Sequence, residues 1–157
     1  MHRPTNEKRN LYPHHELIMK LVTGREVGSV DEAVQRLLFA LGFKSKLLGT
    51  TYLKESILLW YGFPRNRRVM MTTDIYPRVA HRHNSTPERV ERAIRNAIID
   101  CDDNGKLIWY NDLVLCEIVC PPYKPTNGEF ISSVVAWLRL QFPNRAKQLS
   151  FLEEIDD

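Results

Sequence analysis

Residues 85–101 have the sequence STPERVERAIRNAIIDC, and a helix of about 100° per residue divides them into an apolar and a polar face. Apolar side chains recur at helical spacing and form a single stripe: Val90, Ala93, Ile94, Ala97, Ile98 and Cys101. The opposite side carries polar side chains and one isoleucine: Glu88, Arg92, Arg95, Asn96 and Ile99, with Arg89 and Glu91 at its edges. Because an amphipathic helix packs through its apolar stripe, this segment is expected to present arginine, asparagine and glutamate outward.

The start of this helix carries a capping pattern. In Ser85-Thr86-Pro87-Glu88 a hydroxyl can accept a hydrogen bond from an unpaired backbone N–H, and Glu88 can reach back to the cap. Pro87 sacrifices no hydrogen bond in the first turn of a helix. We therefore expect a helix that begins at this capping box and extends to about Cys101.

The preceding residues supply a partner helix, predicted at about residues 70–83. If Tyr76 to Arg95 form a helix-turn-helix, Val79 and Ala80 face the second helix, and the small Ala80 allows close approach. Asn84 falls in the turn, where asparagine tolerates the left-handed conformation. An ordinary helical hairpin with a charged outer face is the alternative interpretation.

The outward side chains are those that recognise DNA bases. Arginine forks onto guanine, asparagine pairs with adenine, and a carboxylate accepts from cytosine. The candidate base contacts are Glu88, Glu91, Arg92, Arg95 and Asn96. The candidate phosphate contacts are Arg82, Ser85, Thr86, Arg89 and Lys124.

The rest of the chain predicts further helices and an all-α fold. Helices are expected at residues 14–22, from a Ser29 or Asp31 cap to about Leu41, and at residues 50–61. A second capping box, Thr126-Asn127-Gly128-Glu129, begins a helix with one apolar face formed by Phe130, Val134, Trp137 and Leu138. The apolar residues 106–120 fit either a strand pair or a buried irregular segment.

This pattern divides the chain into three parts. Residues 1–28 form an N-terminal arm with a short helix, the arm at residues 1–11 being disordered. Residues 29–142 form the helix-turn-helix domain, and residues 143–157 form an acidic tail that contains Glu153, Glu154, Asp156 and Asp157.

Charge is distributed unevenly, although the net charge is only +3. Residues 63–96 carry eight arginines and three acidic residues, whereas residues 97–157 carry five basic and ten acidic residues. A basic block is typical of a protein that presents one face to a polyanion, and a solvated helical face by chance is the alternative.

Composition indicates a cytoplasmic protein of 157 residues with no membrane association. The N-terminus lacks the apolar region of a signal peptide, and no stretch approaches the roughly 18 apolar residues of a membrane span. The odd number of cysteines, three, agrees with a reducing compartment.

No arrangement of residues indicates an active site or a metal site, so we expect neither enzyme activity nor a cofactor. His81 and His83 would point about 200° apart on a helix, which suits one metal ion poorly. Cys116 and Cys120 lack the close pairing of zinc ligands and are expected to be core thiols. The tryptophans are likewise expected in the core: Trp60, Trp109 and Trp137.

Four motifs occur in order along the chain: YLKE (residues 52–55), YPRVA (76–80), RVERAIRNAI (89–98) and KPTNGEF (124–130). Together they resemble the C-terminal effector domain of stage 0 sporulation protein A, a response regulator of endospore formation. The likeness extends from about Ser29 to Leu140.

This resemblance implies a six-helix domain whose helix-turn-helix binds a short promoter box in the major groove, as a dimer or in tandem. RNA polymerase is a further candidate partner. The family's base contacts match Glu91, Arg92 and Arg95, whereas Asn96 stands where the family has a histidine, so base preference there stays open. The family's receiver domain does not fit within this chain length, so no aspartyl phosphorylation is expected.

Two other functions fit the sequence. The chain could be a degenerate relative that titrates or heterodimerises with a related regulator, although retention of Arg92 and Arg95 argues against it. It could also be a helical small-molecule sensor, an interpretation that depends on the apolar residues 106–120.

Overall fold

The structure, a computed structural model, describes residues 11–24 and 27–143. The predicted arm at residues 1–11, apart from Leu11, lies outside these ranges, and so does the predicted acidic tail from residue 144 onward.

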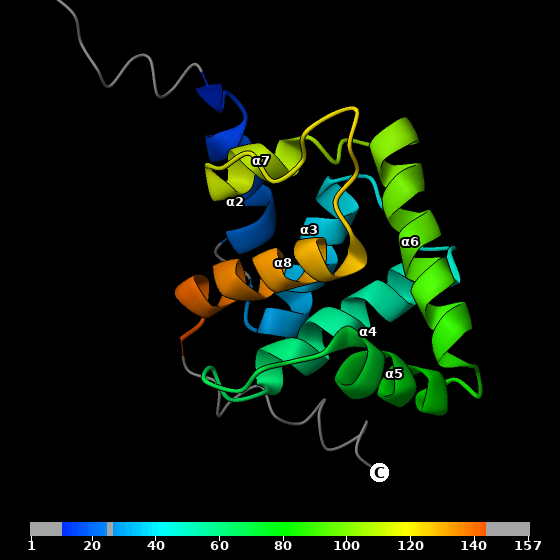
Figure 1. Cartoon of the computed structure of the whole chain (residues 1–157). Helices are drawn as coiled ribbons and strands as arrows, with labels where there is room; N and C mark the ends of the chain where they lie inside the picture. The colour runs from blue at the N-terminus through cyan, green and yellow to red at the C-terminus, as the bar shows by residue number, and fades with distance from the viewer. Residues whose placement is uncertain (1–10, 25–26, 144–157) are drawn as a thin grey trace, which may run out of the picture.

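The described residues form an all-α fold, as predicted (Figure 1). Seven α-helices and one π-helical segment occur in this part of the chain, where the only β-bridge is the isolated one between Cys120 and Tyr123. In chain order the elements are α2 (His15–Thr23), α3 (Val30–Ala40), α4 (Leu48–Gly62), η1 (Met71–Ile75), α5 (Tyr76–Arg82), α6 (Pro87–Asn104), α7 (Trp109–Val114) and α8 (Asn127–Gln141). None of these helices is long and apolar enough to cross a membrane.

Helix α4 is central to the packing and contacts α3, α6 and α8 (Figure 1). Its Leu53, Ile57 and Leu59 are fully buried. The predicted apolar face of α8 is confirmed, since Phe130, Val134, Trp137 and Leu138 are all buried. The N-cap of α3 is Ser29, whose hydroxyl accepts from the backbone N–H of Glu32. These helices form the frame against which α5 and α6 pack.

Helix α2 belongs to the same core, although the sequence places it ahead of the helix-turn-helix domain. Its Ile18 and Val22 are fully buried, and the helix packs against α3 and α7. The backbone N–H of His14 donates to Asp112 Oδ2 over 2.9 Å, and the His14 ring stacks on Trp109. The start of α2 is thereby tied to α7.

The strand pair considered for residues 106–120 is wrong. This segment contains the short helix α7, which ends where Leu115 takes a left-handed φ of 56°, followed by an irregular stretch. The Asn111 side chain bonds that stretch: its Oδ1 accepts from the N–H groups of Ile118 and Val119, and its Nδ2 donates to Val119 O. One amide therefore supplies the hydrogen bonds that a partner strand would have supplied.

The single helix predicted at residues 70–83 is two elements, η1 and α5. Pro77 cannot donate a backbone hydrogen bond, and its ring would clash with the carbonyl of Thr73 in a regular α-helix. A π-helical turn is wider and accommodates this conflict. Just before η1, the backbone N–H of Met70 donates to Asp74 Oδ2 over 2.7 Å, which ties the start of this turn to a side chain within it.

Two expectations about the core need correction. Cys101 is buried, but Cys116 and Cys120 are exposed because they lie in the loop after α7. Trp137 is buried, whereas Trp60 and Trp109 are half-buried at the edge of the core.

Candidate nucleic-acid interface

Helices α5 and α6 form the predicted helix-turn-helix, and α5 packs against both α4 and α6. Val79 and Ala80 are buried on the inner side of α5, as expected. Asn84 has a φ of 51°, which confirms the left-handed turn position. The N–H of Ser85 then donates to Ala80 O over 2.9 Å and closes the turn.

Helix α6 begins one residue later than the predicted capping box requires. Thr86, not Ser85, is the N-cap, and its hydroxyl accepts from the N–H of Arg89 over 3.3 Å. Arg89 therefore occupies the position of the capping carboxylate, and Glu88 does not close a box. The N–H of Ser85, from which Glu88 would accept in the predicted box, donates to Ala80 O instead.

The two faces of α6 are those that the helical spacing predicts. Val90, Ile94, Ala97, Ile98 and Cys101 are buried, and Ala93 is half-buried. The side chains on the opposite face are exposed, namely Glu88, Arg89, Arg92, Arg95 and Asn96, while Glu91 and Ile99 are half-buried. We call Glu88, Arg89, Glu91, Arg92, Arg95 and Asn96 the polar face of α6. The structure thus brings all five candidate base contacts onto one surface.

An ion pair lies on this polar face. Glu91 Oε1 and Arg95 Nη1 are 3.0 Å apart, one helical turn from each other. Both residues line a shallow hollow of about 430 Å³ between α6 and the start of α5, with Thr72, Tyr76, Pro87, Glu88 and Arg92. Two arginines and two glutamates of α6 therefore lie around one concave site.

Gly49 of α4 allows the backbone of α6 to come unusually close. A Cβ atom at this position would lie 2.0 Å from Ala93 O, a distance that no side chain tolerates. Only glycine fits here, so α4 and α6 touch through their backbones at the middle of the polar-face segment.

A buried carboxylate anchors the turn. Glu55 of α4 is 7% exposed, and its two oxygens contact His83 Nε2 at 2.7 Å and Arg82 Nε at 3.3 Å. The ring of Tyr52 lies edge-on to His83. Arg82, a candidate phosphate contact, is thus held by a carboxylate in this structure. Glu55 lies in the YLKE motif, but no local spacing rule connects it with Arg82 or His83.

Lys124, another candidate phosphate contact, is also paired. Its Nζ lies 2.9 Å from Asp102 Oδ2 and 3.0 Å from Asp103 Oδ1, at the C-terminal end of α6. Hydrogen bonds to these two carboxylates raise the pKa of Lys124. Of the other phosphate candidates, Thr86 and Arg89 are exposed at the start of α6, and Ser85 is half-buried.

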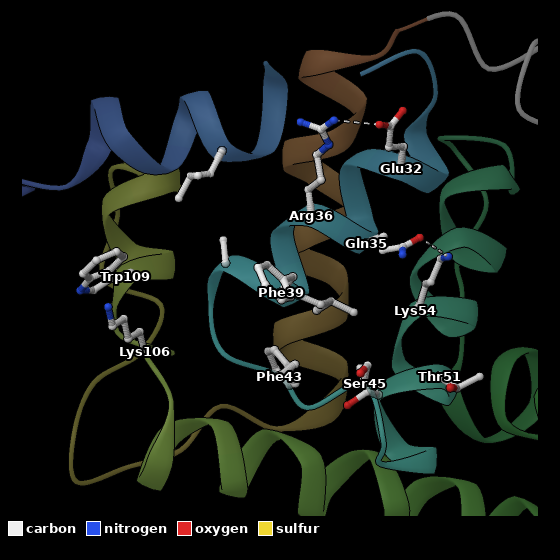
Figure 2. Close-up of a pocket in the computed structure, with 14 residues that line it drawn as sticks. Glu32, Gln35, Arg36, Phe39, Phe43, Ser45, Thr51, Lys54, Lys106 and Trp109 are labelled. Carbon is white, nitrogen blue, oxygen red and sulfur yellow. Dashed lines mark hydrogen bonds and ion pairs between the residues drawn. The ribbon is translucent and has the colours of Figure 1, made fainter. Parts of the chain in front are cut away.

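A larger groove of about 850 Å³ shares no lining residue with the polar face (Figure 2). Phe39 of α3 points into it and is 82% exposed. Charged side chains that line the groove have partners: Arg36 forms an ion pair with Glu32. Lys54 donates a hydrogen bond to Gln35 and forms an ion pair with Asp31. From residues 106–120, on which the small-molecule interpretation depends, only Lys106 and Trp109 line this groove.

The two histidines near the turn differ in their surroundings. His83 is engaged by Glu55, whereas His81 is exposed. No group of three or more potential metal ligands occurs within residues 11–24 and 27–143.

A protein-family model matches two-thirds of the chain. The family is described as the sporulation initiation factor Spo0A C terminal, and the match covers residues 34–138. These residues include α4, α5, α6 and α7 in full, with most of α3 and α8. The helix-turn-helix and its polar face therefore lie within the matched region, and the chain belongs to the family of the C-terminal, DNA-binding effector domain of the sporulation initiation factor Spo0A.

Proposed function

We propose that this domain is a sequence-specific transcription regulator whose α6 enters the major groove with its polar face toward the base edges. The observation that carries this proposal is the row of exposed Arg92, Arg95 and Asn96 on the second helix of a helix-turn-helix. In this motif the second helix is the one that enters the groove.

Five polar-face residues contact bases in this proposal, each through the chemistry of its side chain. Arg92 and Arg95 donate paired hydrogen bonds to guanine, and Asn96 pairs with adenine. Glu88 and Glu91 accept from the amino group of cytosine, and Glu91 also orients Arg95 through their ion pair.

A second group of side chains binds phosphates and adds affinity without sequence information. Thr86 and Arg89 flank the N-terminus of α6, where backbone N–H groups also favour an anion. Ser85, Arg82 and Lys124 complete the group. Arg82 and Lys124 would exchange a carboxylate for a phosphate on binding, so they contribute less affinity than an unpaired cation.

The proposed setting is a cytoplasmic regulator without catalytic activity that binds promoter DNA as a dimer or in tandem. Two half-sites at a fixed spacing, about one helical turn or a multiple of it apart, are the signature of such binding.

The test begins with selection of bound sites from a random DNA pool, followed by titration of the selected and a scrambled duplex at several salt concentrations. We expect a preferred box, and an affinity that falls steeply as salt rises. Arg92→Ala should relax the preference at one base pair, with a loss of about 1–3 kcal/mol on the selected duplex alone. Arg36→Ala, on α3 and away from the polar face, is the matched control and should bind as the wild type does.

Other results would redirect the assignment. If Arg92→Ala weakens both duplexes equally, Arg92 is a backbone contact. If the wild-type protein shows neither a preferred box nor a salt dependence, a protein-interaction module replaces the proposed function.

A further inference from the structure

Asn127, the first residue of α8, connects three helices through one amide group. Its Nδ2 donates to the hydroxyl oxygen of Tyr76 on α5 and to the backbone carbonyl of Glu91 on α6, each over 3.0 Å. Asn127 is 8% exposed, and the start of α8 lies beside α6 (Figure 1). Both amide hydrogens are therefore used between helices, one for each helix of the helix-turn-helix.

The cap of α8 does not require this amide. Thr126 is the N-cap, and its hydroxyl accepts from the N–H of Glu129 over 3.1 Å. The same hydroxyl donates to Glu129 Oε1 over 3.0 Å, whereas in the predicted capping box this carboxylate would accept from the backbone N–H of Thr126. The side chain of Asn127 is consequently available for contacts outside its own helix.

Tyr76 needs a partner because it is buried. Its side chain is 6% exposed, and burial raises the pKa of its hydroxyl, while the hydrogen bond from Asn127 acts in the opposite direction. No buried side-chain nitrogen or oxygen within the described residues lacks a hydrogen-bond partner. Loss of the Asn127 amide would leave the Tyr76 hydroxyl and the Glu91 carbonyl less satisfied at once.

The Glu91 carbonyl lies within the polar-face segment of α6. Two residues further along, the Ala93 carbonyl rests against Gly49 of α4. Two contacts from different helices, so close together on the backbone, restrain both the rotation of α6 about its axis and its distance from the core. Paired arginine–base hydrogen bonds tolerate errors of only about 0.5 Å and 10–20°.

We propose that Asn127 is the positioning residue of the helix-turn-helix, fixing the rotation of α6 and thereby the base discrimination of Arg92 and Arg95. This inference depends on the proposed function, because it assigns Asn127 to the accuracy of base contacts and not to contact with DNA itself.

Two substitutions test the role. Asn127→Asp keeps the size of the side chain and suits the first turn of a helix, but replaces the donor by an oxygen that faces the Glu91 carbonyl. Asn127→Ala removes the amide without adding charge. For both, the affinity ratio between the selected and scrambled duplexes should fall about fivefold or more, while the salt dependence is unchanged. Tyr76→Phe removes one of the two partners and should lower the ratio by less.

Thr126→Ala is the matched control. It removes the cap of α8 next to Asn127 and lowers stability, yet leaves both Asn127 hydrogen bonds in place. Its affinity ratio should equal that of the wild type. A fall of the ratio in Thr126→Ala as large as in Asn127→Ala would overturn the proposal, because general destabilisation would then explain both.

Amide NMR spectra of the free protein separate this proposal from the proposed function. In Asn127→Ala the amide signals of residues 91–95 should shift and exchange faster, whereas in Thr126→Ala the changes should stay within α8. Unchanged α6 signals, or an unchanged affinity ratio, would overturn the role of Asn127. Absence of any duplex preference in the wild-type protein would instead overturn the proposed function and, with it, the link to base discrimination.

Discussion

The carboxylate of Glu91 and the guanidinium of Arg95 lie 3.0 Å apart in the centre of the polar face of α6. Their side chains are 36% and 53% exposed, and an exposed pair at this helical spacing contributes only about 0.3–0.5 kcal/mol. The pair is therefore weak enough to rearrange when DNA binds. In the proposed function, the ion pair orients Arg95, one of the two arginines proposed to contact guanine, in the free protein.

Replacement of Glu91 by Gln should loosen the orientation of Arg95 without harming the fold. We expect unfolding free energy to fall by less than about 0.5 kcal/mol. Affinity for scrambled DNA should rise, because a negative charge near the phosphates is lost, while preference at the base pair contacted by Arg95 should relax. Denaturant unfolding measures the change in stability. Titration with the scrambled duplex and with single-base variants of the selected box measures the changes in affinity and in base preference. Glu88→Gln removes the same charge two positions after the cap residue Thr86, and it should raise scrambled-DNA affinity without relaxing the Arg95 base pair. If both variants relax that base pair equally, the ion pair has no orienting role.

Loss of the Glu55 carboxylate should weaken the turn between α5 and α6. Glu55→Gln keeps the shape but loses two charge-assisted contacts, to His83 and Arg82, and we expect a cost of about 1–3 kcal/mol in unfolding free energy. Urea unfolding measures this cost. Glu32→Gln, which removes a carboxylate paired with Arg36 on the surface of α3, is the control and should cost well under 1 kcal/mol. If both variants lose the same unfolding free energy, the contacts of buried Glu55 stabilise the fold no more than those of the surface residue Glu32.

A methyl group at Gly49 should push α4 and α6 apart. The added Cβ would meet Ala93 O at 2.0 Å, and overpacking of this kind costs about 1–3 kcal/mol or more. Gly128 is the second residue of α8 as Gly49 is of α4, but a Cβ there would meet only Met71 Cγ, at an ordinary 3.6 Å. Gly128→Ala should therefore be neutral or stabilising, because alanine favours a helix. Thermal unfolding of the two variants provides the comparison, and equal effects would contradict the backbone contact.

Local patterns sufficed to predict much of the fold. The apolar stripe of α6, the turn at Asn84 and the caps at Ser29 and Thr126 each depend on residues a few positions apart, and the structure confirms them. The errors arose where tertiary contacts replaced local rules. Residues 106–120 are rich in strand-forming residues, but the Asn111 side chain bonds their backbone and no partner strand is needed.

The candidate site was predictable in part for the same reason. The residues of the polar face follow from helical spacing alone. Glu55, Gly49 and Asn127 do not, because each acts on a helix distant in sequence, and no spacing rule connects Asn127 with Glu91 or Glu55 with His83. The pairing of Lys124 with Asp102 and Asp103 is equally invisible before the chain folds.

Cys101 makes stability depend on pH in the alkaline range. It is fully buried, its Sγ donates to Leu41 O over 3.1 Å, and burial raises the pKa of its thiol from 9.0 to about 12. In the unfolded chain the thiol loses its proton near pH 9, so above that pH unfolding releases a proton. The stabilising contribution is complete below pH 9 and is lost progressively as pH rises toward 12. Burial also raises the pKa of Tyr110, which adds a contribution of the same sign above pH 10.

We therefore expect the free energy of unfolding to fall between pH 9 and pH 11, by at most about 1.4 kcal/mol per pH unit for one thiol. Urea unfolding at a series of pH values measures this slope. Cys101→Ala should lower stability at pH 8 through the cavity it leaves, and should have a shallower slope above pH 9 because the titrating group is gone. Cys116→Ala, which removes an exposed thiol, is the control and should keep the wild-type slope. A slope in Cys101→Ala as steep as in the wild type would place the alkaline sensitivity in other groups, Tyr110 first among them.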